Sequence, residues 1–189
     1  MKRIVILASG SGTNAENIIK YFQKSNVITI THVLSNNKDA KVLKRAKRLK
    51  ISNSSFNKDD FFNTDKVLNI LKDKADFIVL AGFLWKIPKN IINDFPDRII
   101  NIHPALLPNY GGKGMYGDNV HKAVVINKEK ETGITIHYVN ENYDEGAIIF
   151  QAKVEVDEGD SFEDVAQKVH QLEYEHFPKV IEQTLLKNG

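Results

Sequence analysis

The sequence predicts an α/β fold in which a mostly parallel sheet carries helices on both faces. Short apolar runs that favour strands alternate along the chain with segments whose apolar residues recur at helical spacing. Such alternation is typical of right-handed βαβ units, which place ligands at the carboxyl ends of their strands. The chain has 189 residues, which is the length of one large domain, so we expect a single domain over 1–189.

The elements follow one another in a regular order. A buried strand is expected at 3–8, where the apolar run is unbroken, and further strands are expected at 27–34, 76–81, 98–102, 133–139 and 147–156, with a short one near 51–56. Helices are expected at 15–22, 38–50, 65–71, 89–95 and 121–126, and a last one follows Ser161, whose hydroxyl suits an N-cap.

The composition excludes several kinds of site. The chain contains no cysteine, so it has no disulfide, thiolate nucleophile or cysteine-based zinc site. Its 26 basic and 24 acidic residues nearly cancel, and the basic cluster at 38–50 is typical of the solvated face of a helix. The apolar run at 4–8 is too short for a membrane span or a signal peptide. We therefore expect a cytoplasmic protein without a nucleic-acid or membrane partner.

The turn after the first strand has the composition of a phosphate site. It reads Ser9-Gly10-Ser11-Gly12-Thr13-Asn14 and leads directly into a helix, where backbone N–H groups and hydroxyls can hold an anion. It matches neither the dinucleotide-binding pattern nor a P-loop, which favours a small phosphate monoester. The alternative is a simple turn with good capping residues.

The most informative stretch follows the strand at 98–102. Asn101 and His103 share one face of an extended segment, where an amide donor and an imidazole suit a reaction in which a carbonyl becomes tetrahedral. The alternative is a strand end with a hydrogen-bonded core histidine. His137, on the strand at 133–139, is either part of the same site or a cross-strand partner.

Two loops are further candidates. The loop at 82–88 can offer backbone groups to a flat heterocycle, or it can be a buried connector packed by Phe83 and Trp85. The glycine-rich segment at 109–120 is either an active-site flap or an ordinary mobile loop.

Five segments, taken together and in this order, resemble the folate-dependent phosphoribosylglycinamide formyltransferases, a family of purine biosynthesis. They are Ser9-Gly-Ser-Gly-Thr-Asn14, Leu80-Ala-Gly-Phe83, Asn101-Ile-His-Pro-Ala-Leu-Leu-Pro108, Gly133-Ile-Thr-Ile-His137 and Asp144-Glu-Gly146. The resemblance implies a Rossmann-like formyltransferase fold, with a phosphate-binding half at 1–100 and a folate-binding half at 101–189. It also implies 10-formyltetrahydrofolate as co-substrate, small-molecule partners only and no metal, in a monomer or homodimer.

The resemblance also assigns residues. It implies a catalytic group of Asn101, His103 and Asp144; substrate binding by Gly12, Thr13, Asn14 and Glu173; and folate binding by Lys58, Leu84, Trp85, Lys86, Ile87, Asn101 and Asn140. Trp85 and Lys58 depart from the family, which commonly has arginine there. An Asp144 carboxylate beside His103 is expected to raise the imidazole pKa, although an aspartate before glycine is commonly only a turn former.

Two other functions stay open from the sequence. One is another formyl-folate enzyme, either a formyltetrahydrofolate hydrolase or a formyltransferase acting on methionyl-tRNA or a sugar nucleotide. These usually carry an added domain, for which we expect no room in 189 residues. The other is a nucleotide-binding module without catalysis, for which the glycine turn alone is sufficient.

Overall fold

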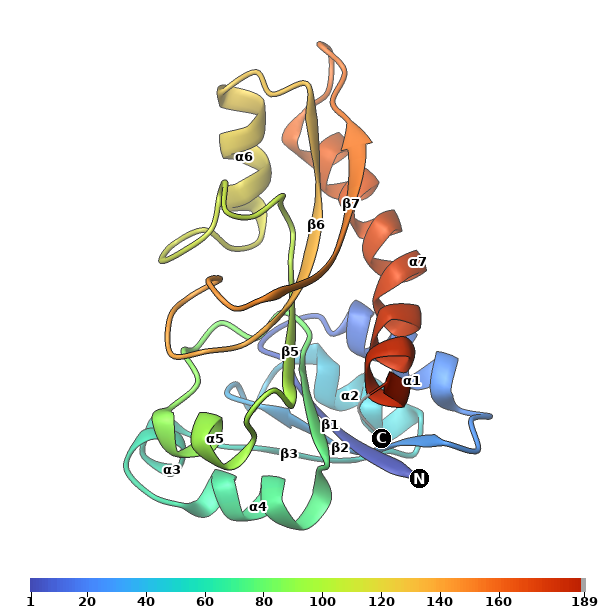
Figure 1. Cartoon of the computed structure of the whole chain (residues 1–189), viewed down its shortest axis with the longest axis vertical. Coiled ribbons are helices and arrows are strands. Elements are labelled where there is room, and N and C mark those ends of the chain that lie inside the picture. Colours follow the sequence, from blue (N-terminus) through green and yellow to red (C-terminus); the bar gives the residue numbers. More distant parts are fainter. Residues whose placement is uncertain (188–189) are drawn as a thin grey trace.

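One seven-stranded sheet runs through the whole molecule in the order β3-β2-β1-β4-β5-β6-β7 (Figure 1). The structure is a computed structural model that describes residues 1–187. The strands are β1 (Lys2–Leu7), β2 (Ile28–Ser35), β3 (Ser52–Ser55), β4 (Phe77–Leu80), β5 (Ile99–His103), β6 (Glu131–Tyr138) and β7 (Ile148–Glu155). The helices are α1 (Thr13–Phe22), α2 (Lys41–Arg48), α3 (Lys58–Phe62), α4 (Lys66–Lys74), α5 (Lys89–Asp94), α6 (Asp118–Ile126) and α7 (Phe162–Lys187).

The sheet is mostly parallel, and the predicted α/β fold is confirmed. Strands β1 to β5 pair in parallel, whereas β6 is antiparallel to β5 and β7 is antiparallel to β6. The strand order reverses between β1 and β4, because the chain builds outward first to β3 and then in the other direction. In open α/β sheets a ligand site is expected outside the carboxyl ends of the strands at such a point.

Helices cover both faces because the buried strands are apolar on both sides. In β1, Ile4 and Ile6 belong to a core shared with α1, α2 and α7, while Val5 and Leu7 belong to a second core shared with α3, α4 and α5. All four side chains are fully buried. This two-sided burial explains why β1 reads as an unbroken apolar run rather than as an alternating one.

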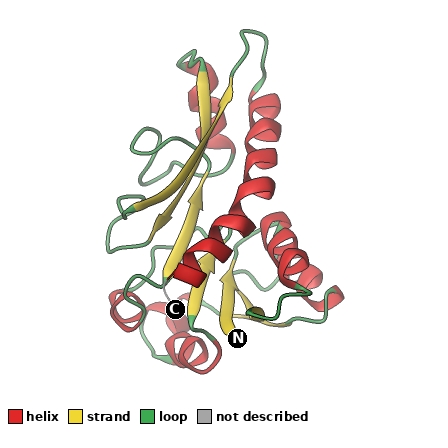
Figure 2. Cartoon of the chain, turned by 45° about the vertical axis from the view of Figure 1, so that its right-hand side comes forward, coloured by secondary structure: helices red, strands yellow, loops and turns green. Residues whose placement is uncertain are grey.

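Helix α7 connects the lower and upper parts of the molecule (Figures 1 and 2). It packs against α1 below and against α6, β6 and β7 above, and it has 26 residues. Its start is fixed by Ser161, whose backbone and side chain exchange hydrogen bonds with Asp164. The helix thereby brings the middle of its length, around Glu173, to the beginning of α1.

The structure differs from the predicted elements mainly at short helices. Helix α3 was not expected, because five residues are too few to show a helical period. A capping box between Asn57 and Asp60 starts it instead. The basic helix α2 is shorter than the range 38–50, and α6 begins three residues before 121. Within residues 1–187, every helix is too short or too polar to span a bilayer.

Candidate active site

A cavity of about 480 Å³ lies at the carboxyl ends of β1, β4 and β5. Its walls come from the glycine turn after β1, the loop after β4, the end of β5, the glycine-rich segment, the loop between β6 and β7, and helices α6 and α7. The lining residues are Ser9 to Asn14, Ala81 to Leu84, Asn101 to Pro104, Gly112 to Gly117, His121, Tyr143, Asp144, His170 and Glu173. The three catalytic candidates therefore share one space with the glycine turn, across the point where the strand order reverses.

The glycine turn is shaped by its contact with α2. Gly12 is the N-cap of α1 and has φ 74°, in the left-handed region. A Cβ at this position would overlap the side chain and Cα of Val42. Gly12 is therefore required by packing against α2, which the sequence pattern alone did not indicate. An N-cap without a side chain also leaves the first N–H groups of α1 open toward an anion.

Helix α2 holds this turn through the main chain. The Val42 N–H donates to the Gly10 carbonyl at 3.1 Å, and Nε of Arg45 donates to the Ser11 carbonyl at 2.8 Å. The Arg45 guanidinium also pairs with the nearly buried carboxylate of Glu16 on α1. The basic helix therefore has a structural role beside the cavity.

Glu16 is surrounded by three cations. Its carboxylate pairs with Lys20 at 2.7 Å, with Arg48 at 2.7 Å and with Arg45. The hydrogen bonds from Lys20 and Arg45 lower the pKa of Glu16 to about 2, against the opposing effect of burial. The group is thus ionised at neutral pH and ties α1 to α2 next to the glycine turn.

A second polar cluster lies where α1 meets α7. Oε2 of Glu173 accepts from Nδ2 of Asn14 at 2.9 Å and from Nδ1 of His170 at 2.8 Å. The hydrogen bond with Glu173 raises the pKa of His170, whereas burial, reinforced by the positive charge of His170, lowers the pKa of His121. Oδ1 of Asn14 and Nδ1 of His121 are buried and have no hydrogen-bond partner among residues 1–187. Both residues line the cavity.

Asn101 and His137 form a cross-strand pair with a defined proton arrangement. They lie opposite each other on β5 and β6, and Nδ2 of Asn101 is 3.1 Å from Nε2 of His137. Nδ1 of His137 is 2.8 Å from the carbonyl oxygen of Tyr138, which can only accept. In the tautomer whose proton lies on Nδ1, the ring donates to that carbonyl, and Nε2 accepts from the Asn101 amide. This fixes which end of the amide faces His137.

His103 is held between a carboxylate and a carbonyl. Its Nε2 lies 2.7 Å from the Tyr110 carbonyl oxygen, and its Nδ1 lies 3.6 Å from Oδ2 of Asp144. The same carboxylate accepts from the Gly112 N–H at 2.9 Å, and its other oxygen lies 3.6 Å from Nε2 of His137. Asp144 thus faces both imidazoles. Its carboxylate contacts side chains of the candidate site in addition to forming a turn.

Burial dominates the pKa of His103. The residue is 4% exposed, and its burial lowers the imidazole pKa, with Asp144 and the Tyr110 carbonyl acting in the opposite direction. The expected pKa above the ordinary value is therefore wrong, because sequence reasoning included the carboxylate and omitted the loss of solvent. Burial alone would raise the pKa of Asp144, but His137, His103 and the Gly112 N–H hold it below its usual value. The pair is accordingly a neutral imidazole beside a carboxylate near pH 7.

The cavity includes some of the residues assigned by resemblance and leaves out others. Gly12, Thr13, Asn14, Leu84, Asn101, His103, Asp144 and Glu173 border it, whereas Lys58, Trp85, Lys86, Ile87 and Asn140 do not. Trp85 packs with Phe61, Phe62 and other aromatic rings, and Ile87 is buried in the core. Lys86 lies over the ring of Tyr143, with Nζ 5.9 Å from its centroid.

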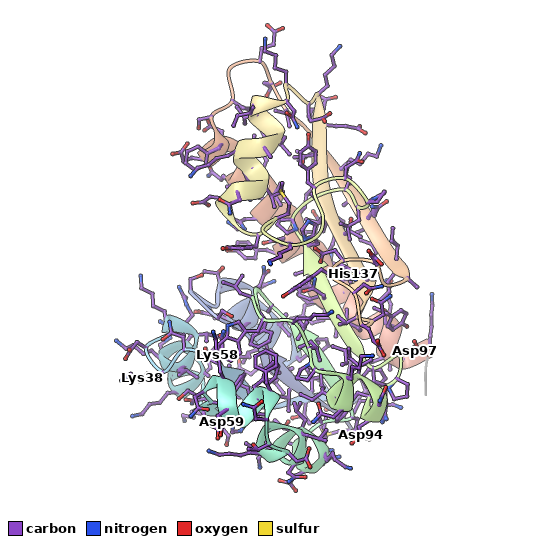
Figure 3. The ribbon with its side chains drawn as sticks, turned by 90° about the vertical axis from the view of Figure 1, so that its left-hand side faces the viewer. Lys38, Lys58, Asp59, Asp94, Asp97 and His137 are labelled. Carbon is purple, nitrogen blue, oxygen red and sulfur yellow. The ribbon has the colours of Figure 1, made fainter. Side chains whose placement is uncertain are left out.

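Lys58 does not line the cavity. It is exposed on α3 in the lower half, toward the same end as Lys38, whereas His137 lies near the middle of the molecule (Figure 3). Sequence reasoning did not indicate His121 and His170 as cavity residues, whereas Tyr143 lies within the range 140–144 that the resemblance places near the folate. His121 and His170 come from α6 and α7, and neither belongs to one of the five segments that carry the resemblance. Within residues 1–187, no cluster of three or more histidine or acidic side chains is arranged to hold a metal ion.

The chain is similar to known proteins over nearly its whole length. The formyl transferase family model matches residues 2–181. A chloroplastic phosphoribosylglycinamide formyltransferase of Arabidopsis thaliana is 36% identical over 187 residues, which are 95% of this chain and 64% of that relative. The phosphoribosylglycinamide formyltransferase of Bacillus subtilis is 34% identical over 100% of this chain and 97% of its own length.

The fold is also similar to that of a solved structure with the same enzyme name. The crystal structure of phosphoribosylglycinamide formyltransferase from Bacillus halodurans superposes with a TM-score of 0.88 at 33% identity, covering 100% of this chain and 97% of that one. These matches cover nearly the whole chain, including the cavity with Asn101 and His103. They assign the chain to one family. The chain belongs to the formyl transferase family, among the phosphoribosylglycinamide formyltransferases of purine biosynthesis.

Proposed function

We propose that this chain transfers the formyl group of 10-formyltetrahydrofolate to the amine of 5′-phosphoribosylglycinamide. The observation that carries the proposal is the meeting of an amide, an imidazole and a carboxylate in a cavity that continues to a glycine turn. Asn101, His103 and Asp144 suit chemistry at a carbonyl, and the turn suits a phosphate. One cavity therefore offers groups for both the reacting carbon and the substrate's anionic end.

The phosphate of the acceptor is assigned to the start of α1. Gly12, Thr13 and Asn14 border the cavity there, and the helix dipole favours an anion at this end. Glu173 is assigned to the polar part of the same substrate, because its carboxylate lies on Asn14 at the cavity wall. Neither assignment needs a metal ion.

The folate is assigned to the opposite side of the cavity. Leu84 and Tyr143 border it there, and Lys86 contacts Tyr143, so the loops at 82–88 and 140–146 approach each other. The proposed contacts of the pteridine are Leu84 and the Asn101 side chain, which border the cavity, together with the backbone of residues 85–87 and Asn140, which do not line it but are next to lining residues or on the loop that carries them. Lys58, an exposed cation on α3 outside the cavity lining, is proposed to contact an acidic group of the folate.

The proposed reaction moves one carbon and one proton. The substrate amine attacks the formyl carbon, and the carbonyl oxygen becomes an oxyanion. One N–H of the Asn101 amide is donated to His137, which leaves its second N–H for that oxyanion. Collapse of the tetrahedral intermediate breaks the bond from the formyl carbon to the folate nitrogen.

His103 and Asp144 are proposed to handle the proton. Because Nε2 of His103 is bound to the Tyr110 carbonyl, Nδ1 is its basic nitrogen, and it faces Asp144. Nδ1 takes the proton that the attacking amine loses, and the neighbouring carboxylate stabilises the imidazolium. The same proton is then delivered to the departing folate nitrogen, so that the residue returns to its starting state.

The remaining expectations belong to the same proposal. We place the enzyme in the cytoplasm, as a monomer or homodimer that meets only small-molecule substrates. We also assign the phosphate mainly to the half at 1–100 and ascribe to the half at 101–189 a share in holding the folate. One continuous sheet joins the two halves, and α7 packs on both. This supports the proposal that the two halves together form one binding site.

An assay with and without acceptor tests the proposal. Loss of formyl-folate absorbance is followed with the purified chain in the presence and absence of 5′-phosphoribosylglycinamide. The proposal predicts loss that depends on the acceptor, with formylated product in equal amount. Acceptor-independent loss would identify a hydrolase, and ligand binding without turnover would identify a binding module.

A further inference from the structure

We propose that Tyr110 is a positioning residue that locks the catalytic imidazole of His103 through its main-chain carbonyl while its phenol is anchored outside the cavity. The proposal rests on the function proposed above for its catalytic consequence. It assigns a role to the start of the glycine-rich segment, and it depends on contacts that run from the residues after α6 through Tyr110 to His103.

The backbone of Tyr110 adopts an unusual conformation. Its φ is 56°, in the left-handed region that residues with a side chain seldom enter. Such a residue costs free energy unless its surroundings hold it in place. Asp144, the other partner of His103, also has a positive φ of 54°. Both groups that contact the imidazole are therefore presented by constrained backbone.

The side chain of Tyr110 supplies the restraint. Its hydroxyl donates to Oε1 of Glu129 at 2.7 Å and accepts from Nδ2 of Asn127 at 2.8 Å. Both partners follow α6, and the ring of Tyr110 packs against the larger core. The residue is thus fixed at its far end by two hydrogen bonds and along its length by apolar contact.

The near end of Tyr110 determines the proton position on His103. A carbonyl oxygen accepts hydrogen bonds and cannot donate them, so the imidazole must carry a proton on Nε2. Nδ1 is then the nitrogen that faces Asp144. Two residues further on, the Gly112 N–H binds the Asp144 carboxylate. One short segment therefore orients both members of the proton-handling pair.

Removing the phenol hydroxyl tests the anchor without touching the carbonyl. In Tyr110→Phe the segment loses both outer hydrogen bonds, and we expect kcat to fall by about three- to tenfold with the KM of either substrate unchanged. The His103 pKa, followed by NMR of the imidazole, is expected to move downward. The Tyr110 carbonyl favours the imidazolium, together with Asp144 and Glu173, while burial and His137 act against it.

Two further variants sharpen the test. Glu129→Ala removes the acceptor from an exposed position and is expected to reproduce the loss in kcat, and combining it with Tyr110→Phe should add little. Tyr21→Phe is the matched control, because its hydroxyl also donates to a glutamate, Glu182, at 2.8 Å, but away from the cavity. We expect wild-type kcat and wild-type His103 resonances in that control.

The results distinguish failure of the positioning role of Tyr110 from failure of the proposed formyl transfer. Wild-type kcat and an unchanged His103 pKa in both Tyr110→Phe and Glu129→Ala would overturn the positioning role. A shifted His103 pKa in a chain that shows no formyl transfer would uphold the lock and refute the reaction, because the NMR measurement uses the resting protein. Should Tyr110→Phe fail to fold, Glu129→Ala alone decides between these results.

Discussion

The amide of Asn101 donates to Nε2 of His137 across the β5–β6 pair, while Nδ1 of the same ring is bound to the Tyr138 carbonyl. The donor end of the amide is therefore oriented by a ring whose own tautomer is set by backbone. A preorganised donor stabilises an oxyanion more than a freely rotating one, because it does not need to reorganise during the reaction. His137 is therefore placed to orient the amide that the proposed reaction uses.

The first prediction concerns the acceptor on His137. In His137→Leu the Asn101 amide loses its partner and is free to rotate, so kcat should fall by roughly tenfold with little change in KM. In His137→Gln the side-chain oxygen can still accept from the amide, and most of the activity should remain. Equal kcat in the two variants, at matched thermal stability, would mean that His137 does not orient Asn101.

The second prediction concerns the charge beside His103. Burial already holds the imidazole pKa below its ordinary value, and Asp144 partly opposes this effect. Asp144→Asn removes the charge and preserves the size of the side chain, so the His103 pKa should fall further and kcat should fall with it. NMR titration of the resting protein measures the shift. A pKa that stays constant or rises would show that the two groups are not coupled electrostatically.

The third prediction compares two glycines of the same turn. Gly12→Ala places a methyl group on Val42 at a positive φ, and we expect it to lower the free energy of unfolding by about 1–3 kcal/mol. A Cβ at Gly10 would meet no atom within 4 Å, so Gly10→Ala should leave thermal stability nearly unchanged. Denaturant unfolding of both variants checks this, and equal stability would refute the packing explanation.

The fourth prediction concerns Glu16 and acid stability. Its pKa is about 2 in the folded chain and 4.5 as a free group, so the unfolded state binds the proton more readily between these values. The stabilisation from Glu16 is complete above about pH 4.5 and is lost as the pH falls toward about 2. Glu16→Gln should therefore lower stability at pH 7 and have a much smaller effect near pH 2. An equal loss at both pH values would contradict the ion-pair account.

The sequence was most informative where local chemistry decides the structure. The apolar runs of β1 and β4 and the glycine turn before α1 were predictable, because strand burial and turn formation depend on neighbouring residues. Asn101 and His103 could be placed on one face from the period of an extended strand. The proximity of Asp144 came only from the resemblance, since no local pattern relates residues 41 positions apart.

Features that depend on tertiary contact could not be read from the sequence. The reason for Gly12 lies on α2, in Val42, and the partner of Glu173 lies on α1, in Asn14. The lowered pKa of His103 follows from its burial, which the pattern around Asn101 did not reveal. In each case the decisive neighbour is distant in the chain.

The most direct test of the account is the rate of formyl transfer in Asn101→Ala with both substrates saturating. Losing an oxyanion donor costs about 100- to 1,000-fold in kcat, and we predict a loss of this size with binding of both substrates preserved. His103→Ala, which removes the proton carrier, should lose at least as much. A single-turnover rate close to that of the wild type in folded Asn101→Ala would contradict the proposed chemistry at the end of β5.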